Sequence, residues 1–153
     1  MKNTAKRITS LLILIALLTV ALISCGATSS SGYCTVVVGE EGSFTEYKVE
    51  LDGLRITEGV FSILKQLDEE NRLDVNYESS TYGAYLTAIG SVTPDTLNGE
   101  YVAIYTSVVT DFDTSTYFTE YQYNGTKLGS SGLGISSMKV EADAIYLFTI
   151  GKY

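Results

Sequence analysis

Three groups of residues in this chain could do chemistry: a cysteine near the start, a set of tyrosines and a pair of aspartates. Cys25 ends the motif Leu22-Ile23-Ser24-Cys25, which follows three basic residues and an apolar run over residues 11–23. A basic start and an apolar stretch of this length are typical of a secretory signal and too short for a transmembrane helix. Because the small Ser24 precedes the thiol, we predict a lipoprotein signal peptide over residues 1–24 and a lipid on Cys25. The alternative is an ordinary signal peptide that happens to contain a cysteine.

The chain has twelve tyrosines, and several fall in step on predicted strands. Tyr101 and Tyr105 share one side of a strand, and Tyr117, Tyr121 and Tyr123 share a side of the next. Rigid amphipathic rings suit the recognition of sugars, peptides or flat cofactors. We therefore predict ligand-binding positions in two groups: Tyr82 and Tyr85 beside a glycine turn, and Tyr101, Tyr105, Tyr121 and Tyr123 on the sheet.

We expect the tyrosine face of the sheet to be exposed and dispensable for folding. The reason is that the core should lie on the opposite side, which carries Val102, Ile104 and Val108. The alternative is that the tyrosines only fill cross-strand pairs on a half-exposed sheet and bind nothing.

The sequence contains no histidine, which excludes Ser-His-Asp and Cys-His nucleophilic sites as well as histidine metal ligands. Asp111 and Asp113 form the tightest acidic pair in a predicted loop. They fit a weak calcium loop, a glycosidase-like pair or, more simply, solvated loop acids. The glycine-rich run over residues 129–134 lacks the lysine and the helix of a phosphate-binding loop. We therefore predict no enzyme activity, no cofactor and no metal site.

Removal of residues 1–24 would leave seven basic and eighteen acidic residues, a formal net charge of −11. Such a surface repels phosphate backbones and anionic lipid headgroups, so we predict no nucleic-acid partner. We expect membrane contact to come from the lipid on Cys25, which would hold the domain on the extracytoplasmic face of the cell membrane. Cys34 is the only other cysteine, and we interpret it as a small buried residue rather than a reactive thiol.

Residues 25–32 are small and polar, which predicts a flexible tether, and residues 33–153 have the size of one domain. Strands are predicted over residues 33–39, 44–51, 73–77, 85–89, 101–109, 117–123 and 144–150, with turns at Asn124-Gly125 and in the glycine and serine cluster over residues 129–137. The spacing of Val60, Leu64 and Leu67 predicts one helix over residues 57–70, with Thr57 as its N-cap. This order predicts an α+β domain, a β-grasp-like mixed sheet with one main helix packed on one face.

Short motifs follow one another at residues 58–64, 82–89, 101–107, 124–125 and 131–143. Their order resembles the transcobalamin C-terminal-like family of bacterial surface domains, often catalogued only as a domain of unknown function (DUF4430). In that family a helix precedes a "yGxYvtsI"-like strand, an aromatic strand and a closing "dGD" turn. The second motif here reads Tyr82-Gly83-Ala84-Tyr85-Leu86-Thr87-Ala88-Ile89. The chain departs from the family pattern in having no tryptophan near Tyr101 and in having Ala142 in place of the glycine of the closing turn.

The resemblance implies a non-catalytic module whose ligand is corrinoid-like or lies on a cell surface. Together with the signal, it predicts a membrane-anchored extracytoplasmic binding module that meets an unknown small molecule or protein. The alternative is an envelope adaptor lipoprotein that recruits another protein through its tyrosine-rich sheet face.

Overall fold

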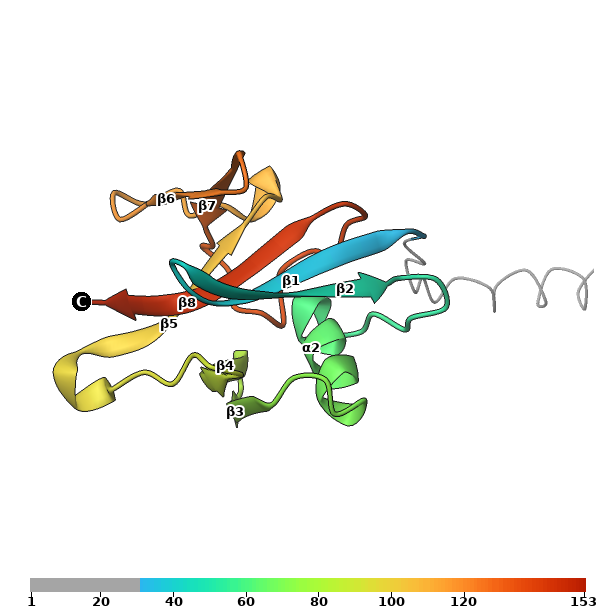
Figure 1. Ribbon diagram of the computed structural model, residues 1–153, viewed down its shortest axis with the longest axis horizontal. Helices are drawn as coiled ribbons and strands as arrows, with labels where there is room; N and C mark the ends of the chain where they lie inside the picture. The colour runs from blue at the N-terminus through green and yellow to red at the C-terminus, as the bar shows by residue number, and fades with distance from the viewer. Residues whose placement is uncertain (1–30) are drawn as a thin grey trace, which may run out of the picture.

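A mixed six-stranded sheet with one helix across it organises residues 31–153, the part of the chain that this computed structural model describes (Figure 1). The predicted α+β class is confirmed. The helix is α2 (Gly59–Glu69), and the strands are β1 (Tyr33–Glu40), β2 (Ser43–Glu50), β3 (Val75–Ser80), β4 (Gly83–Ile89), β5 (Glu100–Thr106), β6 (Glu120–Tyr123), β7 (Thr126–Ser130) and β8 (Ile145–Lys152). Two short 3-10 helices are η1 (Thr96–Asn98) and η2 (Val109–Asp111). The signal peptide predicted over residues 1–24, the lipidation site Cys25 and most of the tether lie outside the described residues.

The large sheet has the strand order β2-β1-β8-β5-β7-β6. The hairpin predicted from the first two strands is present, because β1 pairs antiparallel with β2 along its whole length. At the centre β1 runs parallel to β8, with Val36 opposite Tyr146, and β8 runs antiparallel to β5. The parallel central pair, reached through a crossing helix, is the arrangement of the predicted β-grasp-like sheet.

The main core lies between α2 and the inner face of this sheet. The helical period predicted the buried side of α2, since Val60, Leu64 and Leu67 are fully buried. They belong to the same cluster as Val36 and Phe148 of the central strands. Burial of such apolar side chains is the main force that holds the helix to the sheet. No helix within residues 31–153 is long and apolar enough to cross a membrane.

The start of α2 differs from the prediction, because Thr57 is not its N-cap. The helix begins at Gly59, and the buried Ser62 hydroxyl accepts the N–H groups of Thr57 and Glu58 at 3.2 and 2.9 Å. Gly59 has a φ of 51°, and a side chain there would collide with the carbonyl oxygen of Met138. The helix start is therefore fixed by contact with a distant loop, which a local capping pattern does not show.

The strands predicted over residues 73–77 and 85–89 are shifted to β3 and β4, which pair only with each other. This two-stranded sheet packs beside α2 on the inner side of the large sheet (Figure 1). Leu73 is buried although it precedes β3.

The sequence predicted only part of the hairpin formed by β6 and β7. The strand expected over residues 117–123 is reduced to β6, and the cluster expected as a turn over residues 129–137 contains the end of β7. Asn124 and Gly125 have φ values of 46° and 78°, which suits the two-residue turn that Asn-Gly favours between strands. Because β7 pairs with β5 only at Tyr105 and Thr106, the hairpin folds over the outer face of the sheet (Figure 1). It closes a second core of Val37, Tyr123, Leu128 and Leu147.

Candidate functional site

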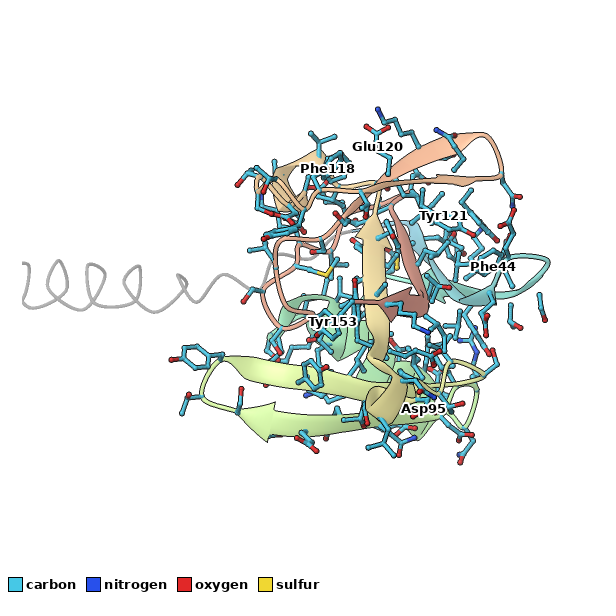
Figure 2. All side chains as sticks on the ribbon, turned by 90° about the vertical axis from the view of Figure 1, so that its left-hand side faces the viewer. Phe44, Asp95, Phe118, Glu120, Tyr121 and Tyr153 are labelled. Carbon is cyan, nitrogen blue, oxygen red and sulfur yellow. The ribbon has the colours of Figure 1, made fainter. Side chains whose placement is uncertain are left out.

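The tyrosines predicted on one side of β5 and β6 come together on the outer face of the large sheet, away from α2. The ring centroids of Tyr105 and Tyr121 lie 5.3 Å apart, and Phe44 of β2 packs edge-on against Tyr121 at 6.1 Å. Further along β5, Tyr101 stacks on Tyr153 at 4.6 Å. We name Phe44, Tyr101, Tyr105, Tyr121 and Tyr153 the aromatic surface; Figure 2 labels three of them.

The aromatic surface is not the separate exposed platform that the sequence predicted. Tyr101, Tyr105 and Tyr121 are half-buried, and Tyr123 beside them is only 7% exposed. The Tyr123 hydroxyl donates a hydrogen bond of 2.6 Å to Glu46 of β2. The expectation that these tyrosines are exposed is therefore wrong for Tyr123, because the β6–β7 hairpin turns its side chain into the second core.

Tyr82 and Tyr85 occupy a different part of the molecule. Tyr82 lies in the turn between β3 and β4 and is 95% exposed, and Tyr85 of β4 is 57% exposed. Because that hairpin forms its own sheet beside α2, the structure does not bring these two residues to the aromatic surface. Their role in ligand binding stays a prediction.

The phenols of this region are held in their neutral form. Burial raises the pKa of Tyr101 and Tyr121 above the ordinary value of 10, and the neighbouring Tyr105 raises both further. Burial, with the hydrogen bond to Glu46, raises the pKa of Tyr123 to about 12. At neutral pH the hydroxyl groups of Tyr101, Tyr121 and Tyr123 are therefore uncharged.

A hollow of about 190 Å³ lies beside β5, and we name it the tyrosine hollow. It is lined by Tyr101, Ala103, Ile104, Tyr105, Asp113, Tyr117, Thr119, Ser130 and Ser131. Tyr117 is 84% exposed, so the hollow is open on that side. Sequence reasoning missed the two serines, because they fell in a predicted turn and reach β5 only through the pairing of β7.

The structure separates the two aspartates of the predicted loop. Asp111 is buried in η2, where its carboxylate accepts the backbone N–H of Lys139 at 2.7 Å and so fixes a neighbouring loop. Asp113 lines the tyrosine hollow instead, and its two oxygens accept the N–H and the O–H of Ser115 at 2.8 Å each. Over residues 31–153, no three His, Cys, Asp or Glu side chains are placed to hold a metal ion.

Cys34 is buried in β1 and forms no disulfide. Burial raises the pKa of its thiol to about 11, so it stays protonated at neutral pH. The interpretation of Cys34 as a small buried residue is confirmed.

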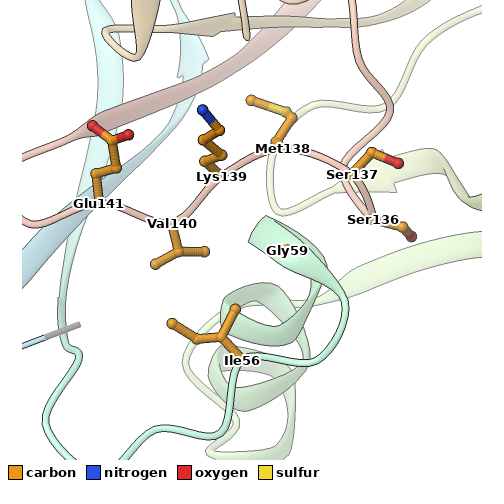
Figure 3. A pocket seen from close by; sticks show the side chains of 8 residues that line it. All are labelled: Ile56, Gly59, Ser136, Ser137, Met138, Lys139, Val140 and Glu141. Atoms are coloured by element: carbon orange, nitrogen blue, oxygen red, sulfur yellow. The ribbon is translucent and has the colours of Figure 1, made fainter. Parts of the chain in front are cut away.

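A larger cavity, of about 490 Å³, lies between the start of α2 and the loop over residues 136–141 (Figure 3). Ile56 and Val140 project toward each other across it, whereas Lys139 points away from the helix. The Lys139 ammonium group donates to Thr110 at 3.0 Å, and the Ser136 hydroxyl accepts the N–H of Ala84 at the same distance. Two polar side chains of this cavity, Ser136 and Lys139, thus make contacts within the protein, and the lining is mainly apolar.

No protein-family model matches the sequence, and no curated protein sequence matches it. Several solved structures share its fold, including the following two. One is a "putative metal binding protein" from Ruminococcus gnavus, with a TM-score of 0.53 and 15% identity over 80% of this chain and 99% of the other. The second is haptocorrin in complex with Cbi, with a TM-score of 0.52 and 15% identity over 82% of this chain and 26% of the haptocorrin chain. At this identity the similarity concerns the fold alone, and the chain matches about a quarter of haptocorrin.

Proposed function

We propose that residues 33–153 form a non-catalytic binding module that holds a small-molecule ligand against the aromatic surface. The observation that carries this proposal is the packing of its rings, whose centroids lie between 4.6 and 6.1 Å from their partners. Rings that neighbouring rings hold in place offer contact area at a small cost in conformational entropy. The hydroxyl groups around them supply hydrogen bonds that orient a ligand.

A corrinoid is the first ligand to test, because haptocorrin in complex with Cbi shares the fold. A corrinoid is a broad flat ring system, too large for a hollow of about 190 Å³. It would therefore lie across the rings rather than enter the tyrosine hollow. A ligand displayed on a cell surface is the second class to test.

We propose further that the module is a lipoprotein held on the extracytoplasmic face of the cell membrane through Cys25. The motif over residues 22–25 supports this proposal. The acidic surface supports it too, since a domain with a net charge of −11 needs a lipid rather than basic residues to stay at a bilayer.

The full chain, purified from membranes in a maltoside detergent, provides the test. Small molecules retained through purification are identified by mass spectrometry, and added Cbi is followed by equilibrium dialysis. Tyr101→Ser and Tyr121→Ser should lose the retained ligand by tenfold or more, since central aromatic contacts carry about 2 kcal/mol each. Tyr33→Ser on β1, outside the aromatic surface, is the matched control. Unchanged retention by both surface variants, with normal circular dichroism, would contradict the proposal.

The adaptor function is a second candidate, favoured by the exposure of Tyr117, which lines the tyrosine hollow and is 84% exposed to solvent. Aromatic side chains at the centre of a patch are typical of protein interfaces. A protein that co-purifies with the wild-type chain and is lost from Tyr117→Ala would favour the adaptor over the small-molecule module.

A further inference from the structure

We propose that the tyrosine hollow binds a quaternary ammonium group of the kind that choline carries. The rings of Tyr101, Tyr105 and Tyr117 would surround the cation, and the carboxylate of Asp113 would be its counter-ion. This inference rests on the proposed function, because it names the ligand class for one part of the same surface.

The charge of the hollow is the first argument. Asp113 is its only charged side chain, and no Lys or Arg is among its lining residues. Asp113 takes part in none of the ion pairs between residues 31 and 153. Its partners are the neutral N–H and O–H groups of Ser115, so no cationic side chain among the described residues balances its charge. A negative site on an acidic chain favours a cation and repels phosphate or carboxylate ligands.

The rings are the second argument. A cation over an aromatic face is attracted by the negative centre of the ring, and groups of such rings recognise quaternary ammonium ligands. Two of the three rings pack against a neighbouring ring, Tyr101 against Tyr153 at 4.6 Å and Tyr105 against Tyr121 at 5.3 Å. Little of their freedom is left to lose when a ligand binds.

The hydroxyl groups favour a quaternary rather than a primary ammonium ion, because several are already bonded within the protein. Ser130 accepts the N–H of Thr119 at 2.9 Å, and Ser131 exchanges hydrogen bonds with the backbone of Leu133 at 2.9 and 3.1 Å. The Thr119 hydroxyl donates to Tyr105 at 3.2 Å. A primary ammonium ion brings three N–H donors that need acceptors, whereas a quaternary ion brings none.

The volume of the tyrosine hollow also fits a quaternary ammonium group. Pockets for drug-sized ligands range over about 300–1,000 Å³, so a hollow of about 190 Å³ suits a single compact group. A calcium ion would need six to eight oxygen ligands, and the hollow offers one carboxylate among its side chains.

The test is a titration of the full chain, in a maltoside detergent, with choline chloride and with its neutral carbon isostere, 3,3-dimethyl-1-butanol. Tyrosine ring signals in NMR spectra report both binding and its location. We expect choline to bind at least about tenfold more tightly than the isostere, because only choline gains the charge interactions. Asp113→Asn should weaken choline binding about tenfold and Tyr117→Ala about threefold to tenfold. Asp74→Asn and Tyr33→Ala, which alter an exposed acid and a tyrosine outside the hollow, should leave binding unchanged.

Phosphocholine separates two sources of the same group. Weaker binding than that of choline, which we expect because Asp113 repels the phosphate, indicates a free quaternary ammonium solute and supports the site. Tighter binding indicates a phosphate-bearing headgroup and contradicts the role of Asp113 as the counter-ion, so it overturns the proposed site. Equal binding of choline and its isostere, unchanged affinity in Asp113→Asn, or no choline binding to the folded chain overturns it. If choline does not bind as expected but binding of Cbi or another retained ligand is still lost in Tyr121→Ser, only the ammonium site is contradicted. If no ligand needs the aromatic surface for binding, the proposed function is contradicted as well.

Discussion

The hydroxyl of Tyr123 donates a hydrogen bond of 2.6 Å to the Oε1 atom of Glu46, across 77 residues of sequence. Asn124 donates to the same oxygen at 3.2 Å. These two bonds fasten the turn of the β6–β7 hairpin to β2, at the opposite edge of the large sheet. The hairpin is therefore held at both ends, by the pairing of β7 with β5 and by this contact.

Removal of the Tyr123 hydroxyl should loosen the hairpin without emptying the second core. We expect Tyr123→Phe to lower the free energy of unfolding by about 1 kcal/mol, since the acceptor is charged but exposed. Urea unfolding measures the change. Glu46→Gln keeps an acceptor oxygen and should cost less. A loss in Tyr123→Phe no larger than that of Tyr33→Phe would contradict a role for this bond.

Alkaline pH should act on the same contact. The pKa of Tyr123 is raised from 10 to about 12 in the folded chain, by burial first and then by Glu46. As the pH rises, the unfolded chain loses the Tyr123 proton at a lower pH than the folded chain does. The stabilisation that comes from the raised pKa is therefore complete below pH 10 and is lost as the pH rises toward 12. Urea unfolding over this window should show a steeper fall for the wild type than for Tyr123→Phe. Parallel curves would show that Tyr123 titrates normally.

Gly59→Ala should be among the most damaging single changes at a glycine. It combines two costs: a φ of 51°, which alanine adopts at about 1–2 kcal/mol, and a collision with the Met138 carbonyl oxygen. Gly53→Ala separates them, because Gly53 has a φ of 77° but open space around it. We expect Gly59→Ala to cost clearly more than Gly53→Ala in thermal and urea unfolding. Equal costs would show that the loop over residues 135–138 moves aside freely.

Leu64→Ala should cost about 2–5 kcal/mol, because Leu64 is fully buried between α2 and the sheet. Leu97→Ala, at a leucine that is 97% exposed, should change stability by no more than about 0.5 kcal/mol. Similar melting temperatures for the two variants would show that α2 is peripheral to the core.

Cys25→Ala should abolish lipid attachment. In a bacterial host fed with labelled palmitate, we expect label on the wild-type chain and none on the variant, with the variant released from membranes or incompletely processed. Cys34→Ala is the control, because a buried thiol should not carry lipid. Equal labelling of Cys25→Ala and the wild type would rule out this anchor.

Local hydrophobic patterns predicted those elements whose buried residues recur at a regular spacing along the segment. The β1–β2 hairpin and α2 have strong hydrophobic periods, and both were found within two residues of the predicted limits. By contrast, β7 contains Gly129 and Ser130, which have little strand preference of their own. The ring of Phe112 packs against Gly129 so closely that a Cβ atom there would lie 2.8 Å from it. This strand is therefore favoured by a tertiary contact that no local pattern records.

The same limit applies to the site. Strand alternation correctly placed Tyr101 and Tyr105 on the side away from α2, because that period follows from backbone geometry. Alternation does not show what covers a face of the sheet, so the burial of Tyr123 in the second core was not predicted. In the tyrosine hollow, Asp113 and Ser130 come together through a backbone hydrogen bond of 2.8 Å, in which the Asp113 N–H donates to the Ser130 carbonyl oxygen. A contact between two such distant segments cannot be read from either segment alone.

The parallel pairing of β1 and β8 bears on how the domain would be oriented if it is anchored through Cys25 as proposed. Both strands have eight residues, so each is about 26 Å long. The chain joins the sheet at the start of β1, and β8 ends at the opposite end of this strand pair, toward the C-terminus (Figure 1). At that end Tyr101 lies opposite Gly151 of β8 and stacks on Tyr153. If the proposed tether enters at the start of β1, the stacked rings would lie at the end of the domain away from the membrane. Solutes in the surrounding medium would then reach these rings before they reach the lipid.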